Sequence, residues 1–159
     1  MHKEGIFRSS PEQNKITQLE SQLNTGNYSL ENADVTVCAT ILKRWLLALN
    51  PPIVGDSQNY EKIIRSIRND DFDSLDKILF NLPKRNKIVL HSILLTLREF
   101  IKPEVALITK MDAKNISLMF APTILSSQNL EPSQSLFNSG YEKDFMLYML
   151  VVLKLKVLD

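Results

Sequence analysis

Residues 35–53 read VTVCATILKRWLLALNPPI, and the spacing of their apolar side chains is the strongest sign of the kind of fold. The apolar side chains recur every three or four residues, which is the repeat of an α-helix with one buried face. They are Val35, Cys38, Leu42, Trp45, Leu46 and Leu49. Two prolines, Pro51 and Pro52, follow and stop the helix, because proline lacks the backbone N–H that a helix interior needs. The stretch therefore predicts one amphipathic helix that ends in a turn.

The same helical repeat occurs along most of the chain, whereas the strict alternation of a β-strand is rare. Gly26 ends a first helical segment, and Asp112 is placed as the N-cap of a later one. We predict further helices near residues 60–67, 72–79 and 88–101, a brief helical turn or loop at 105–110, and a last helix from about Glu142. Residues 126–140 are polar and are predicted to form a surface loop. The expected architecture is an all-α, compact single-domain bundle of about seven helices over residues 1–159.

The composition of the chain narrows the range of possible functions. The chain has 19 basic and 18 acidic residues, so it lacks the basic excess that is typical of nucleic-acid binders. The single cysteine cannot form an internal disulfide and no secretory signal is visible, which favours a cytoplasmic setting. The apolar segment 145–158 is interrupted by Lys154 and Lys156 and is shorter than the roughly 20 residues of a membrane span. We predict that it is a core helix, with no transmembrane segment.

Signs of an independent active site are missing from the sequence. The four glycines stand far apart, so no glycine-rich phosphate loop is predicted. Neither His2 nor His91 has cysteine, histidine or carboxylate neighbours at metal-ligand spacing. No nucleophile–base pair stands out either. A self-contained enzyme is therefore not expected.

Four short motifs, in order and at consistent spacings, carry a family resemblance. They are EGIFRSS at residues 4–10, ILK at 41–43 continued by LNPPI at 49–53, Leu82-Pro83 followed by Asn86, and NISLMFAPT at 115–123. Together they resemble the RhoGAP family over about residues 4–125. Each motif alone is weak evidence, but all four in register are specific.

The resemblance implies a RhoGAP-like fold and a GTPase-activating function. The partner implied is a Rho/Rac-type small GTPase in its GTP-bound state, and the partner would bind both Mg²⁺ and GTP. Arg8 matches the family's arginine finger, which is supplied in trans to stabilise the transition state of hydrolysis. A guanidinium suits this task because it is planar, always charged and complementary to phosphoryl oxygens. Viewed without the resemblance, Arg8 would be an ordinary solvated loop arginine.

Four further residues match positions with partner-binding roles in the family. Lys43 corresponds to a lysine that supports the partner contact and the arginine loop. Asn115 corresponds to an asparagine that helps to position the loop and touches the GTPase; the alternative is a helix-start or core-edge hydrogen bond. Pro122 matches the family's proline, which shapes the helix end. Leu47 stands where the family usually has arginine, so we expect an apolar contact there.

Two alternatives to activation remain at this stage: a non-activating Rho-GTPase-binding module of the same fold, and a helical scaffold domain. Leu47 favours the binding module, as does Pro11, which replaces a family glycine. Only three residues precede the first motif, so we expect the family's N-terminal helix to be absent. We expect that this absence either leaves residues 3–11 mobile or opens a groove that another copy of the chain fills. Recruitment to membranes would come through the GTPase or through flanking domains.

Overall fold

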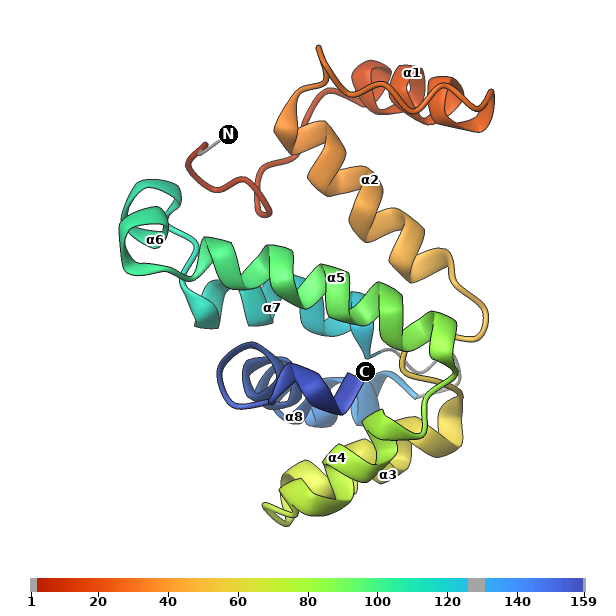
Figure 1. Ribbon diagram of the computed structural model, residues 1–159, viewed down its shortest axis with the longest axis vertical. Helices are drawn as coiled ribbons and strands as arrows, with labels where there is room; N and C mark the ends of the chain where they lie inside the picture. The colour runs from red at the N-terminus through yellow and green to blue at the C-terminus, as the bar shows by residue number, and fades with distance from the viewer. Residues whose placement is uncertain (1–2, 126–130, 159) are drawn as a thin grey trace.

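The computed structural model describes residues 3–125 and 131–158, and every regular element in them is helical. Figure 1 shows the helices, of which α5, α7 and α8 form the centre while α1 and α2 stand to one side. In chain order they are α1 (Gln13–Asn24), α2 (Val35–Ala48), α3 (Ser57–Arg68), α4 (Phe72–Phe80), α5 (Lys84–Phe100), α6 (Pro103–Thr109), α7 (Ala113–Ile124) and α8 (Pro132–Val151), followed by the 3₁₀ turn η1 (Leu155–Leu158). The all-α prediction is confirmed.

Aspartate side chains begin half of these helices. Asp34, Asp56, Asp71 and Asp112 are the N-caps of α2, α3, α4 and α7, and each accepts a backbone N–H from the first turn. A cap of this kind satisfies an N–H group that has no partner within the helix, and it stabilises the helix by about 1 kcal/mol. The predicted role of Asp112 is confirmed by its 2.7 Å bond from the Asn115 amide.

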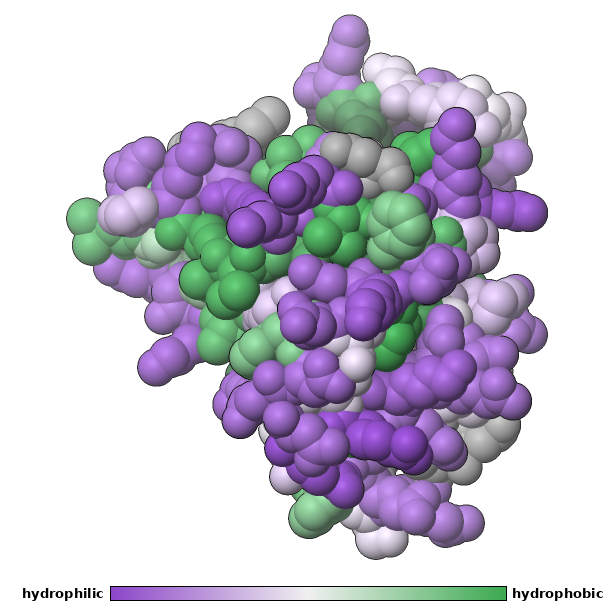
Figure 2. Space-filling model, turned by 60° about the horizontal axis from the view of Figure 1, so that its bottom comes forward, coloured by the Kyte–Doolittle hydropathy of each residue, from purple (hydrophilic) through white to green (hydrophobic). Residues whose placement is uncertain are grey.

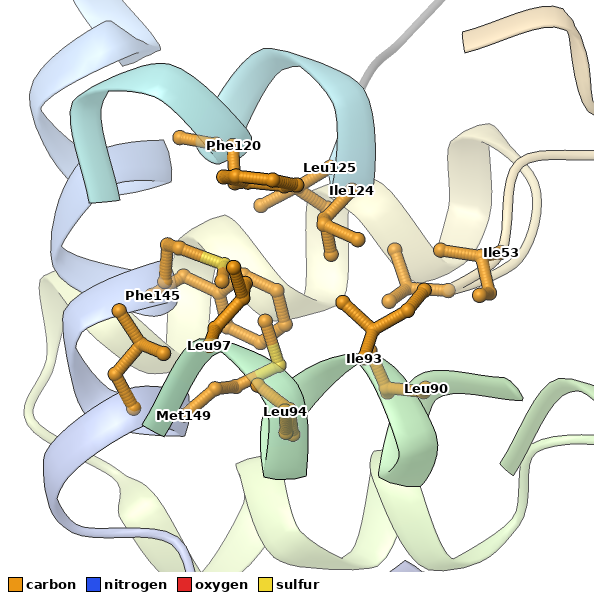
Figure 3. Close-up of a cluster of buried hydrophobic side chains, with 14 of the residues drawn as sticks. Ile53, Leu90, Ile93, Leu94, Leu97, Phe120, Ile124, Leu125, Phe145 and Met149 are labelled. Atoms are coloured by element: carbon orange, nitrogen blue, oxygen red, sulfur yellow. The ribbon is translucent and has the colours of Figure 1, made fainter. Parts of the chain in front are cut away.

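The main core lies where α5, α7 and α8 meet, with the turn after α2 closing one side (Figure 3). Its fully buried side chains include Leu90, Leu94, Ile116, Phe120, Ile124, Phe145 and Met149. Burying one such side chain contributes about 1.5–3 kcal/mol, so this cluster is the principal source of stability. The segment 145–158 supplies several core residues, as predicted, although α8 ends at Val151, and Val151 and Val152 are exposed.

The start of the last helix was predicted wrongly. Helix α8 begins at Pro132 rather than near Glu142, so residues 132–140 of the predicted loop are helical. Proline is well suited to the first position of a helix, because its fixed φ fits and its missing N–H is not needed there. The Phe137 ring also packs edge-on against Tyr141, and the Arg68 guanidinium lies 5.6 and 5.2 Å from the two ring centroids. Residues 126–130 of the predicted loop lie outside the described residues.

Helix α2 is covered on only part of its apolar face. It packs against α1 and α7, and Leu46 is fully buried, but the Trp45 side chain is 47% exposed. Arg44 holds the neighbouring helix α1 through Glu20 and Gln13. A groove of about 540 Å³ remains between α1 and α2, lined mostly by apolar side chains. The predicted stripe on α2 is therefore partly core and partly surface.

Exposed apolar residues are unevenly distributed over the molecule. Figure 2 turns the end formed by α3 and α4 toward the viewer, and most of that end is hydrophilic. Apolar residues gather on the side where α6 lies, where Leu107 and Ile108 are 70% and 55% exposed. In residues 3–125 and 131–158, no helix has the length and apolar character needed to cross a membrane.

A buried polar contact joins α3 to α8. The Tyr60 hydroxyl donates a 2.6 Å hydrogen bond to Glu142 Oε1, and Asn138 Nδ2 lies 3.3 Å from the same hydroxyl. Burial raises the pKa of Glu142, and the hydrogen bond from Tyr60 opposes this effect only in part. Because the folded state prefers the protonated carboxyl, the ionised form of Glu142 costs stability at pH values above its raised pKa.

The raised pKa of Glu142 leads to a pH-dependent prediction for the stability of Glu142→Gln. This substitution removes the charge and keeps an acceptor for the Tyr60 hydroxyl. Between the unfolded pKa and the raised folded pKa, wild-type stability falls as pH rises, while the variant lacks this dependence. The stability of the variant relative to wild type should therefore be greatest near pH 7 and should decline as the pH is lowered toward 4.5. Urea unfolding at several pH values measures the difference. A constant difference would mean that Glu142 titrates normally in the fold.

Candidate functional site

The segment around Arg8 is a tight turn with a buried base. Ile6 and Phe7 are each 4% exposed, whereas the Arg8 side chain is exposed to solvent. The amides of Arg8 and Ser9 both donate to the Gly5 carbonyl at 2.8 Å. Gly5 has φ +64°, a conformation that glycine adopts without the steric cost that a side chain would add. The turn thus directs Arg8 outward while its neighbours point into the protein.

Two contacts fix this turn to the rest of the fold. The Phe7 ring lies edge-on to Phe100 of α5 and to Phe120 of α7, at centroid distances of 4.9 and 5.1 Å. The Gly5 amide donates to the Thr109 carbonyl at the end of α6, at 2.7 Å. We expected residues 3–11 to be mobile, but Ile6 and Phe7 belong to the main core. The reason is that Phe7 occupies the space between α5 and α7 that would otherwise be empty.

Lys43 of α2 also binds the turn. Its half-buried ammonium Nζ donates to the Phe7 carbonyl oxygen at 2.5 Å. No carboxylate pairs with Lys43 among the residues that the structure describes, and burial lowers the pKa of its ammonium. A hydrogen bond from a charged donor is roughly twice as strong as a neutral one. Lys43 therefore connects α2 to the backbone of the residue next to Arg8.

Asn115 of α7 supports the same turn indirectly, through the end of α6. Its Nδ2 donates to the Lys110 carbonyl at 3.1 Å. Lys110 has φ +56° and follows Thr109, whose carbonyl binds Gly5. Asn115 thereby holds the strained end of α6, and α6 holds the turn. The helix-start hydrogen bond expected of this position is made by its backbone amide instead.

The remaining predicted residues lie on exposed faces of α2 and α7. Leu47 is 55% exposed and follows Lys43 by one helical turn. Pro122 is exposed and lies inside α7, close to its end. Leu118, which sequence reasoning overlooked, is 57% exposed and shares a face of α7 with Asn115 and Pro122. The available signal was its place three residues after Asn115, which puts the two side chains on the same helix face.

The chemistry available here is that of one presented guanidinium. Within residues 3–125 and 131–158 no three metal-ligating side chains come together. Arg8 projects from a support made by α2, α5, α6 and α7, and exposed apolar residues lie on each of these helices. Such an arrangement suits a charge inserted into the site of another protein.

The domain model of the RhoGAP family, described as "RhoGAP domain", matches residues 1–129. The chain belongs to the RhoGAP family. Among curated relatives, Rho GTPase-activating protein gacHH of Dictyostelium discoideum is 30% identical over 122 residues, covering 77% of this chain and 8% of the relative. Rho GTPase-activating protein gacA of the same organism is 28% identical, covering 86% and 38%. The chain thus spans less than half the length of these RhoGAP relatives.

Solved structures agree with the fold. The crystal structure of human Rho GTPase activating protein 15 superimposes with a TM-score of 0.82 at 20% identity, covering 94% of this chain and 72% of that one. The BH domain from GRAF, the GTPase regulator associated with focal adhesion kinase, gives a TM-score of 0.79 at 16% identity, covering 94% and 81%. These similarities establish the RhoGAP architecture of the helices around Arg8.

The bond from Lys43 to Phe7 predicts how the arginine turn of this RhoGAP domain is held. Lys43→Met keeps the length and the apolar stem of the side chain but leaves the Phe7 carbonyl without its charged donor, a loss of about 1.5–3 kcal/mol. Amide exchange at Arg8 and Ser9 should then become at least about tenfold faster, as measured by hydrogen–deuterium exchange. Lys114→Met on α7 is the matched control and should leave these amides unchanged. Equal exchange in wild type and Lys43→Met would show that Phe7 packing alone fixes the turn.

Proposed function

We propose that this domain accelerates GTP hydrolysis by a Rho/Rac-type small GTPase in its GTP-bound state, with Arg8 inserted in trans as an arginine finger. The observation that carries the proposal is the contrast between two neighbouring residues. Arg8 is exposed, while Phe7 is buried and its carbonyl oxygen accepts a hydrogen bond from Lys43. Family membership supports an activating role in general. The partner would hold GTP and Mg²⁺, and the domain would serve as an accessory to the partner's reaction.

The proposed mechanism is electrostatic. Negative charge spreads over the oxygens of the transferred phosphoryl group in the transition state, and a guanidinium placed against them lowers the barrier. Prepositioning matters because a side chain that is already ordered pays less entropy on reaching that geometry. The Gly5 turn, the Phe7 ring and the Lys43 bond order the backbone at Arg8 before any partner binds. Only the side chain of Arg8 has to adjust on docking.

The proposed docking surface surrounds Arg8. On α2 it includes Lys43 and Leu47, and on α7 it includes Asn115, Leu118 and Pro122. Helices α2 and α7 pack against each other, so these two faces adjoin. Leu47 and Leu118 offer exposed apolar area to the partner, and Leu47 does so at the position where the family usually has an arginine. We expect the domain to act in the cytoplasm and to reach membranes through the GTPase or flanking segments.

The test is single-turnover GTP hydrolysis by a panel of Rho-family GTPases, with and without the domain. Arg8→Ala should remove most of the acceleration, which is about 10³–10⁵-fold for a finger supplied in trans. Affinity for the GTP-loaded partner should change little, because the guanidinium acts mainly in the transition state. Arg8→Lys should restore little activity, since an ammonium does not reproduce the planar fork.

Arg85→Ala is the matched control, because Arg85 is an exposed arginine at the start of α5, away from the turn. With this variant, the GTPase should hydrolyse GTP as fast as it does with the wild-type domain. Binding to a Rho-family GTPase without any acceleration would instead support the non-activating binding module. Absence of binding to every GTP-loaded member would support the scaffold alternative.

We also propose that the groove between α1 and α2 mediates self-association. Trp45 and Leu30 border it and are 47% and 51% exposed, so a second copy would remove this apolar area from water. Sedimentation equilibrium should show a dimer at micromolar concentration, and Trp45→Asp should return the protein to a monomer. Leu107→Asp, at an exposed apolar position on α6, serves as the control and should still dimerise. A wild-type monomer at all concentrations would refute this proposal.

A further inference from the structure

Helix α3 carries a row of basic side chains with no acidic partners. Lys62, Arg65 and Arg68 follow one another at intervals of three residues, and all three are exposed. Positions three apart are neighbours on a helix surface, so the three charges form one row. In the described part of the chain none of them makes a salt bridge. A row of like charges repels itself, and an anionic partner would relieve that repulsion.

A groove of about 520 Å³ lies between this row and the first turns of α8. Arg65 and Arg68 line it, and of the lining residues that the structure describes Glu61 alone is acidic. The Arg68 guanidinium rests on the rings of Phe137 and Tyr141, which orders the side chain in a fixed place. Arg65 has no such contact and is available to an anionic group that enters the groove.

Two protruding apolar residues stand beside the groove. Leu136 and Phe137 are adjacent in the second turn of α8, and their side chains are 79% and 65% exposed. Leu136 is more exposed than any other large apolar residue among those described. Phe137 forms part of the groove wall, whereas Leu136 projects outside it. Protruding apolar side chains flanked by cations are the combination that binds at the interface of a bilayer.

We propose that this α3–α8 face binds the surface of a membrane that contains anionic lipids. Leu136 and Phe137 would enter the boundary between headgroups and acyl chains, while Lys62 and Arg65 contact lipid phosphates and carboxylates. An acidic protein segment would match the charges equally well. A segment lying in the groove would leave Leu136 in water, however, because Leu136 is not among the described residues that line the groove.

The position of this face allows it to work independently of the arginine site. Figure 1 shows α3 at the opposite end of the long axis from the N-terminal segment that carries Arg8. A membrane bound at α3 and α8 and a GTPase bound at Arg8 would therefore occupy different ends of the domain. The inference thus goes beyond recruitment through the GTPase, because the domain would bind lipid without a partner.

The experiment is co-sedimentation of the chain alone with vesicles. Vesicles of phosphatidylcholine with about 30% phosphatidylserine should bind the protein, and vesicles of phosphatidylcholine alone should bind it at least about tenfold more weakly. Binding should decrease in high salt, which screens exposed charges. Arg65→Glu should reduce partitioning by about tenfold or more, because it removes one favourable charge and adds a repulsive one. Leu136→Ser should also reduce partitioning, with the net charge unchanged.

Lys154→Glu is the matched control, since it makes the same change of net charge at an exposed lysine just after α8. It should retain most of the binding, and thermal melts should show that all variants are folded. Equal losses in Lys154→Glu and Arg65→Glu would overturn the assignment of the face. Failure of the wild-type protein to bind anionic vesicles would also overturn the assignment. An acidic protein segment would then be the better candidate to bind the α3–α8 face.

Discussion

The Phe7 ring between Phe100 and Phe120 is the contact on which the candidate site depends. It places the residue before Arg8 inside the same core that joins α5 and α7, so the position of the arginine is set by core packing. An exposed turn held only by its own hydrogen bonds would sample many conformations, because each ordered residue costs about 1–2 kcal/mol of backbone entropy. Anchoring one neighbour in the core offsets that cost while leaving the guanidinium outside.

Different helices hold the turn through different hydrogen bonds. Lys43 reaches Phe7 from α2, and Asn115 reaches it indirectly, through the end of α6. Helix α2 shares little of the main core and leaves Trp45 partly in water, so its place relative to the turn depends strongly on the Lys43 bond and on packing against α7. The charge on Lys43 is thus used inside the domain, where burial disfavours it unless the Phe7 carbonyl solvates it.

Sequence patterns predicted the helices well where apolar residues repeat and a cap marks the boundary, as at Asp112. They failed at the start of α8, because residues 132–140 are mostly polar and their helix is stabilised by contacts with α3 that no local pattern reveals. The motifs identified Arg8 and Lys43 as candidates, but the pairing of Lys43 with the Phe7 carbonyl is a contact across 36 positions. Leu118 was missed because sequence alone does not tell which side of α7 faces the core.

The commitment of Lys43 to the Phe7 carbonyl has a consequence for partner binding. Since this ammonium is half-buried and already hydrogen-bonded, it presents less charge to a partner than an exposed lysine would. One turn further along α2, Leu47 adds exposed apolar area at the position where the family usually has an arginine. Leu118 adds exposed apolar area on α7. The proposed docking surface therefore relies on burial of apolar side chains more than on charge, and its affinity should depend less on long-range steering. Among the residues of the proposed docking surface, Arg8 is an exposed cation, and in the proposed mechanism its charge acts on the partner's phosphates.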